Sequence, residues 1–99
     1  MPSRVRPSSG NVFQDLGFPR QEAENLRIRS DLMISLCRLI EARELTQAQA
    51  AKLLGVTQPR ISDLTRGKIE LFSVDGLIEM LGHAGARVSF QVRTRKRVA

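Results

Sequence analysis

One stretch of the sequence, QAQAAKLLGVTQPRISDLTR at residues 47–66, constrains the fold of this chain most strongly. Two helices that cross at a short turn need a small residue at the fifth position of such a stretch, and Ala51 lies there. The turn needs a residue that can adopt positive φ at the ninth position, which is Gly55. The positions that the unit would bury are all apolar: Ala50, Leu54, Val56, Ile61 and Leu64. The spacing therefore predicts a helix-turn-helix at residues 47–66.

Capping residues and glycines set the limits of the two helices in this unit. Thr46 is followed three residues later by Gln49, which is the pattern of a capping box, so the first helix begins near Gln47 and stops at Gly55. The second helix is expected at residues 58–65, with Thr57 as its N-cap and Gly67 beyond its end.

Two further helices are expected on either side of the helix-turn-helix. Residues 20–43 contain no Pro or Gly, and apolar residues recur there at spacings of three, four and seven, namely Leu26, Met33, Leu36, Leu39 and Ile40. This pattern is typical of a long amphipathic helix. Ser73 can cap another helix, at residues 74–83.

The N-terminal segment divides into a polar tail and a short apolar arm. Residues 1–10 contain two Pro, three Ser and one Gly, so we expect them to be disordered. Residues 11–18, NVFQDLGF, form a short apolar patch that ends at Pro19. We expect this arm to pack on the core, and dimer exchange or a partner-binding surface are the alternatives.

The last apolar segment has the period of a β-strand. In ARVSFQV, residues 86–92, apolar and polar side chains alternate, which is typical of a half-buried strand. The only other place for a strand in the chain is the short N-terminal arm, so the simplest partner is the same strand of a second copy. This predicts a homodimer held by Val88, Phe90 and Val92, followed by a mobile basic tail at residues 93–99.

The net charge favours a polyanionic partner but does not locate its binding surface. The chain has 99 residues, which suits one small domain and excludes a multidomain enzyme, and its formal net charge is +6. The surplus lies at the ends, because residues 11–85 contain nine basic and ten acidic side chains. Within that nearly neutral body, residues 46–68 carry a net +3 and residues 69–85 a net −3.

Cysteine and histidine usage argues against catalysis and metal binding. Cys37 is the single cysteine, which excludes an internal disulfide and a multi-cysteine zinc site and favours a reducing compartment. His83 has no second His, Asp or Cys nearby for a metal site or a nucleophile–base pair. We expect no enzyme activity, no cofactor and no membrane span, and a cytoplasmic location.

The string LTQAQAAKLLGVTQPRISDLTRGK resembles the lambda-repressor-like, or XRE-type, DNA-binding domains. With NVFQDLGF upstream and FSVDGLIEMLGHAGARVSFQV downstream, residues 11–92 resemble most the HigA-like antitoxins of type II toxin–antitoxin systems. The resemblance implies a homodimer that represses its own operon and binds a RelE- or HigB-like ribonuclease toxin. Related phage and chromosomal regulators share the helix-turn-helix without a toxin.

The predicted helix at residues 58–65 supplies the candidates for base contacts. A helix in the major groove turns its first residues toward base edges, while Ile61 and Leu64 hold its other face in the core. Arg60 is the first candidate, because a guanidinium binds guanine O6 and N7 bidentately, and Gln58 can bind adenine N6 and N7. The full set of base-edge candidates is Thr57, Gln58, Pro59, Arg60 and Asp63.

The other members of this set have more than one interpretation. Pro59 or the methyl group of Thr57 can contact a thymine methyl. Asp63 can accept from cytosine N4, or it can orient Arg60 or Arg66 by a charge-assisted hydrogen bond. The candidates for phosphate contacts flank the helix and are Gln47, Arg66 and Lys68.

The sequence thus predicts an all-α, five-helix, lambda-repressor-like domain at residues 11–92 with one C-terminal β-strand paired across a homodimer. The expected function is a sequence-specific DNA-binding repressor of a palindromic operator whose half-sites lie about 10 bp apart. By resemblance it is the antitoxin of a type II pair. The alternatives are a protein-binding module that chiefly neutralises a toxin, and a phage or chromosomal repressor with no toxin partner.

Overall fold

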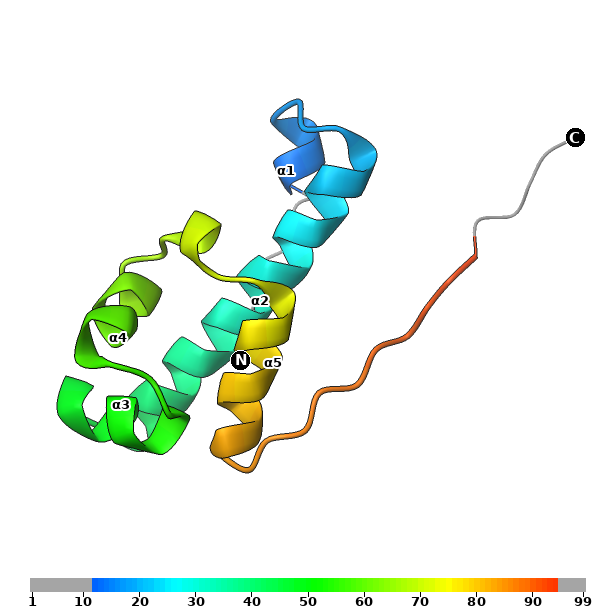
Figure 1. The fold of residues 1–99 in the computed structure, drawn as a ribbon. Coiled ribbons are helices and arrows are strands. Elements are labelled where there is room, and N and C mark those ends of the chain that lie inside the picture. Colours follow the sequence, from blue (N-terminus) through cyan, green and yellow to red (C-terminus); the bar gives the residue numbers. More distant parts are fainter. Residues whose placement is uncertain (1–11, 95–99) are drawn as a thin grey trace, which may run out of the picture.

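The computed structural model describes residues 12–94 and contains five α-helices in that range (Figure 1). In chain order the elements are α1 (Val12–Asp15), α2 (Arg20–Ala42), α3 (Gln47–Leu54), α4 (Gln58–Thr65), the 3-10 helix η1 (Ile69–Leu71) and α5 (Val74–His83). The prediction of an all-α, five-helix domain is confirmed. The predicted tail at residues 1–10 and residues 95–99 of the predicted basic tail lie outside the described residues.

Helix α2 is the longest helix, and α1, α4 and α5 pack on it, whereas α3 packs chiefly on α4 and α5 (Figure 1). Helix α1 lies at the N-terminal end of α2, α5 lies alongside α2, and α4 packs near the C-terminal end of α2. Two backbone hydrogen bonds close the end of α2, from Leu45 N to Ile40 O at 3.1 Å and from Glu44 N to Glu41 O at 3.0 Å. Glu44 has a φ of 52°, where glycine is the usual residue, so this turn was not evident in the sequence.

The helix-turn-helix forms as its spacing predicts. Gln49 N donates to Thr46 Oγ1 at 3.1 Å and Thr46 N donates to Gln49 Oε1 at 2.9 Å, which completes the capping box at the start of α3. Gly55 ends α3 with a φ of 73°, and Val56 N donates to Ala51 O at 3.0 Å. A second glycine-dependent turn follows α4, where Gly67 also has a φ of 73°.

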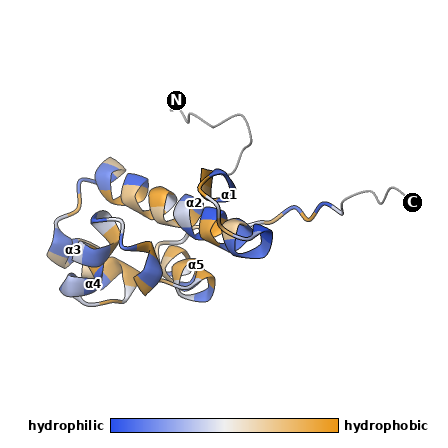
Figure 2. Cartoon of the chain, turned by 90° about the horizontal axis from the view of Figure 1, so that it is seen from above, coloured by the Kyte–Doolittle hydropathy of each residue, from blue (hydrophilic) through white to orange (hydrophobic). Residues whose placement is uncertain are grey.

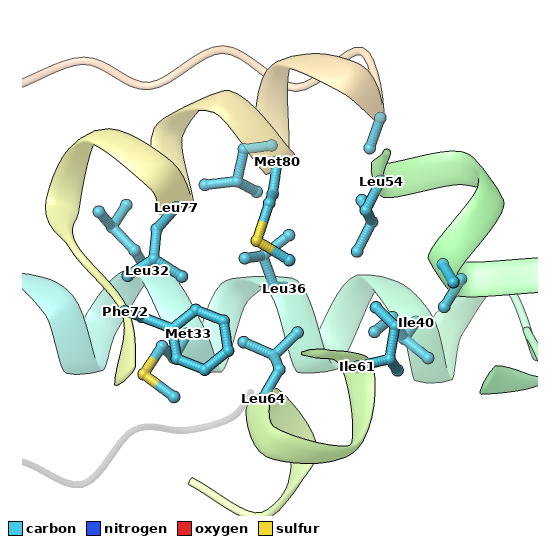
Figure 3. Packing of buried hydrophobic residues seen from close by; sticks show 14 residues of the cluster. Leu32, Met33, Leu36, Ile40, Leu54, Ile61, Leu64, Phe72, Leu77 and Met80 are labelled. Atoms are coloured by element: carbon cyan, nitrogen blue, oxygen red, sulfur yellow. The ribbon is translucent and has the colours of Figure 1, made fainter. Parts of the chain in front are cut away.

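The core lies where α2, α3, α4 and α5 meet (Figure 3). Its largest fully buried side chains are Leu36, Leu54, Ile61, Leu64 and Leu77. All the apolar positions that define the helix-turn-helix pattern are buried except Val56, which is half-buried. Burial of apolar surface by these residues is the main force that fixes α4 on the domain.

Helix α1 and the residues after it fold back onto the first turns of α2. The Phe13 and Phe18 rings meet edge to face with centroids 6.1 Å apart, and Phe18 N donates to Phe13 O at 3.2 Å. The arm contacts α2, but α1 has no buried residue and no described residue of the arm belongs to the hydrophobic core, so the predicted packing on the core is not seen. Val12, Leu16 and Phe18 are exposed to solvent.

Residues 86–94 leave the end of α5 as an extended segment that forms no strand within the described part of the chain (Figure 1). Val88 packs partly against the core, whereas Phe90 is 56% exposed and Val92 is 89% exposed. The physical reason is that a strand exists only when it hydrogen-bonds to another, and residues 12–94 of one copy supply no second strand. The strand at residues 86–92 and its pairing across a dimer stay predictions.

Candidate nucleic-acid interface

The first turn of α4 projects from the domain with its side chains free. Thr57, Gln58 and Pro59 are exposed, while Ile61 and Leu64 one turn later are fully buried. Thr57 has N-cap geometry, but its side chain makes no capping hydrogen bond. These three residues are therefore presented to solvent on a helix whose opposite face is anchored in the core.

Arg60 differs from its neighbours because its guanidinium is held against the domain. Its Nη1 donates to the carbonyl oxygen of Leu71 at 2.9 Å, and its Cζ lies 4.2 Å from the centroid of the Phe72 ring, a cation–π contact. The side chain is half-buried. This contact could not be predicted from the sequence, since its partners lie in a turn that is held by contacts distant in sequence.

Asp63 is half-buried on the same helix and forms no ion pair with Arg60 or Arg66 among residues 12–94. Its main-chain carbonyl accepts a hydrogen bond from Lys68 N at 3.1 Å, which helps to close the turn after α4. The carboxylate therefore does not orient either arginine in this structure. Contact with a cytosine stays a prediction.

The candidates for phosphate contacts lie at both ends of the helix-turn-helix. Gln47 is exposed at the first position of α3, where backbone N–H groups have no partner within the helix and the helix dipole attracts anions. Arg66 is exposed after the last residue of α4, and Lys68 is half-buried at the start of η1. Figure 2 shows hydrophilic residues along the outer parts of α3 and α4.

The acidic residues of the segment at residues 69–85 are exposed on a different part of the chain. Glu70 lies in η1, and Asp75 and Glu79 lie on α5. None of these three carboxylates forms an ion pair with a described basic side chain. The segment with a net −3 is therefore available to a basic partner.

His83 packs against the turn of the helix-turn-helix, a contact that sequence reasoning missed. A Cβ atom added to Gly55 would lie only 3.1 Å from Cε1 and 3.2 Å from Nδ1 of the His83 ring. The end of α5 thus packs over the turn between α3 and α4. Glycine suits this position for two reasons: it adopts positive φ without strain, and its lack of a Cβ leaves room for the imidazole.

Cys37 lies on α2 beside the C-terminal end of α4. Its thiol is half-buried and lies 3.8 Å from the carbonyl oxygen of Leu64. Burial raises the pKa of Cys37, and the negative charge of Glu41 adds to the shift, which disfavours the reactive thiolate. Residues 12–94 contain no group of three or more His, Cys, Asp or Glu side chains that could hold a metal ion. No helix among the same residues has both the length and the apolar character needed to cross a membrane.

Comparison with known proteins identifies the domain. Residues 12–93 match a family described as a helix-turn-helix domain. The chain is also similar to the solved structure of a protein assigned as an XRE family transcriptional regulator, with 35% sequence identity and a TM-score of 0.70, over 79% of this chain and 90% of that one. A search of the curated proteins finds no match. The chain therefore belongs to the helix-turn-helix domain family, as an XRE-like member.

Proposed function

We propose that this protein is a sequence-specific DNA-binding repressor that inserts the first turn of α4 into the major groove. The observation that carries the proposal is the exposure of Thr57, Gln58 and Pro59 on a helix anchored by fully buried Ile61 and Leu64. A rigidly held helix whose first turn is free is what direct readout of base edges requires. Membership of the helix-turn-helix family supports the same function.

Within this proposal each exposed group has a chemical role. Gln58 binds an adenine through N6 and N7, and the Thr57 methyl or Pro59 contacts a thymine methyl. Arg60 binds guanine with the N–H groups that Leu71 leaves free, and Asp63 accepts from a cytosine N4. Contacts from Gln47, Arg66 and Lys68 to phosphates fix the position of the helix but carry no sequence information.

The proposed operator is palindromic because the protein acts as a homodimer. Residues 86–92 of two copies pair as antiparallel strands, which covers Phe90 and Val92 and gives the unpaired backbone of each segment its hydrogen bonds. Two α4 helices related by a two-fold axis then read half-sites about 10 bp apart. A repressor must share a compartment with its DNA, which agrees with the cytoplasmic location expected from the single cysteine.

The test is fluorescence anisotropy with a duplex that contains the region upstream of the protein's own coding sequence. A scrambled duplex of the same composition is the control. We expect the upstream duplex to bind at least about a thousandfold more tightly at physiological salt. Gln58→Ala should lower affinity for the upstream duplex by about 1–3 kcal/mol and leave binding to the scrambled duplex unchanged. Equal affinity of the wild type for both duplexes contradicts the proposal.

We further propose that the repressor is the antitoxin of a type II toxin–antitoxin pair. The support beyond the sequence resemblance is the exposed acidic segment on η1 and α5, which suits a basic ribonuclease, together with the exposed apolar arm at α1.

The neighbouring genes and a copurification experiment test the antitoxin role. An adjacent small basic reading frame whose product copurifies with the chain supports the antitoxin role, whereas an isolated gene or a prophage setting favours a repressor with no toxin partner. A toxin complex without specific operator binding would indicate a module that chiefly neutralises the toxin.

A further inference from the structure

The turn between α4 and α5 is held by two arginines that come from two different helices. Arg29 of α2 donates from Nη1 to the carbonyl oxygens of Ile69 and Phe72, both at 3.2 Å. Arg60 of α4 donates from Nη1 to Leu71 O at 2.9 Å and lies over the Phe72 ring. The carbonyl that holds Arg60 thus lies, along the chain, between the two carbonyls that Arg29 holds.

Arg29 is itself fixed to the long helix. Its Nε donates to Asn25 Oδ1 at 2.7 Å, one turn earlier on α2. Hydrogen bonds from a guanidinium are charge-assisted and stronger than those between neutral groups. Arg29, Asn25 and Arg60 line one surface pocket of about 570 Å³, so the two arginines face a common space. Arg29 therefore ties the turn to the most extensive element of the domain.

The turn has little regular structure of its own. Its backbone hydrogen bonds are Ile69 N to Gly67 O at 2.8 Å, Leu71 N to Lys68 O at 3.0 Å and Phe72 N to Ile69 O at 3.2 Å. A single 3-10 turn of three residues is a weak element, because its hydrogen bonds have poorer geometry than those of an α-helix. Phe72 is 3% exposed and packs in the hydrophobic core, which fixes the plane of its ring. The Leu71 carbonyl is exposed and lies between the two carbonyls that Arg29 holds, so the direction of this acceptor of Arg60 depends on Arg29.

We infer that Arg29 is a positioning residue for DNA recognition, which acts through the turn at residues 69–72 to orient the guanidinium of Arg60. This inference rests on the proposed function, since Arg60 must contact DNA for its orientation to matter. Among the described residues Leu71 O is the one acceptor for Arg60, so its other N–H groups are free for a guanine. A guanidinium that is already held loses less conformational freedom when it binds.

The experiment is selection from a pool of duplexes with a randomised core, followed by sequencing of the bound DNA. The wild type, Arg29→Met, Arg60→Met and a matched control, Arg27→Met, are compared. Arg27 lies on the same helix, but it bonds to Glu24 at 2.9 Å and Asp31 at 3.1 Å instead of the turn. Met keeps most of the apolar stem of the arginine and removes its donors.

Comparison of Arg60→Met with the wild type identifies the base pair at which the protein loses its preference for one base when the Arg60 guanidinium is removed. We expect Arg29→Met to lower discrimination at that same pair several-fold, while preferences at the other pairs and the profile of Arg27→Met stay as in the wild type. The double variant should lose no more at that pair than Arg60→Met alone. A merely structural role predicts a uniform loss at every pair, which would overturn the inference, as would an unchanged profile.

A milder variant keeps the test decisive if Arg29→Met fails to fold. Asn25→Ala removes one exposed acceptor of Arg29 and leaves both carbonyl contacts possible. It should give a smaller loss at the Arg60-dependent pair, and no change there would overturn the inference. The proposed function and the role of Arg29 are contradicted by different results. A wild type that enriches no sequence contradicts the proposed function, whereas a wild type with clear preferences that do not depend on Arg60 or Arg29 contradicts only this inference.

Discussion

The helix-turn-helix at residues 47–66 and the extended segment at residues 86–94 both have clear sequence patterns, yet only the first forms its predicted structure within one chain. The helices α3 and α4 have a capping box, a glycine turn and buried side chains close to one another in sequence. Residues 86–92 have an alternating pattern and no strand to pair with in the described part of the same chain. A local pattern therefore determines local structure only when its hydrogen-bond partners are local as well.

This contrast also separates two kinds of stability. The helix-turn-helix gains its free energy of folding from burial inside one domain. Any free energy gained by residues 86–92 depends on protein concentration, because it comes from a second copy. Substitutions in the two regions should therefore change different observables.

The largest expected effect is the loss of a core side chain from α4. Ile61 is 0% exposed, so Ile61→Ala leaves a cavity and should lower the free energy of unfolding by about 2–5 kcal/mol. Urea denaturation followed by circular dichroism measures this. Val92→Ala, at a position that is 89% exposed in a single copy, is the control and should change stability by less than about 0.5 kcal/mol at concentrations where the protein is monomeric. A similar loss of unfolding free energy in both variants would contradict the distinction between the helix-turn-helix and the segment at residues 86–94.

The turn of the helix-turn-helix offers a matched pair of glycines. Gly55 and Gly67 have the same φ of 73°, but an added Cβ at Gly55 meets His83 at 3.1 Å, whereas one at Gly67 meets nothing within 4 Å. Both substitutions to Ala should cost about 1–2 kcal/mol for the left-handed backbone, and Gly55→Ala should cost more. The difference should vanish in a His83→Ala background. Equal melting temperatures for the two single variants would show that His83 does not pack on the turn.

The dimer is tested on the two faces of the predicted strand. Phe90→Asp places a charge on its apolar face and should raise the dimer dissociation constant at least about tenfold, or about 1.4 kcal/mol, in sedimentation experiments. Gln91→Asp adds the same charge on the opposite face and is the control. At concentrations where the wild type and Phe90→Asp are both monomeric, the helical core should unfold at the same midpoint in the two proteins. A monomeric wild type at micromolar concentration would contradict strand pairing.

The smallest expected effect compares two N-cap threonines. The Thr46 side chain accepts from Gln49 N at 3.1 Å, whereas the Thr57 side chain makes no capping hydrogen bond. Thr46→Ala should therefore lower the free energy of unfolding by about 1 kcal/mol, and Thr57→Ala should leave it nearly unchanged. In DNA binding the order should reverse, since Thr57 is exposed at the proposed interface. Equal thermal stability of the two variants would mean that the capping box contributes nothing.

Much of the fold could be predicted because its signals are short-range. The positions of Thr46, Gly55 and Gly67 fix where α3 and α4 begin and end, and the apolar spacing fixes which faces are buried. The end of α2 was less evident, because Glu44 adopts the positive φ that glycine usually provides. Two backbone hydrogen bonds, from Leu45 N to Ile40 O and from Glu44 N to Glu41 O, close the turn there without a glycine.

The candidate site was predictable in outline but not in the detail of its side chains. The exposed residues Thr57 and Gln58 follow from the spacing, because their exposure depends only on the helix period. The contact of Arg60 with Leu71 and Phe72 does not follow, because it requires the path of the turn after α4. That path is held by contacts distant in sequence, namely the burial of Phe72 in the core and the hydrogen bonds from Arg29, which precedes the turn by 40 residues or more.

The central claim is that the first turn of α4 contacts DNA. The most direct measurement is an NMR titration of the isotope-labelled protein with the duplex from upstream of its own coding sequence. The account predicts that the largest amide shifts occur at residues 57–60 and 63, with smaller ones at Gln47, Arg66 and Lys68. Shifts confined to α5 or to residues 86–94, with α4 unchanged at saturating DNA, would contradict it.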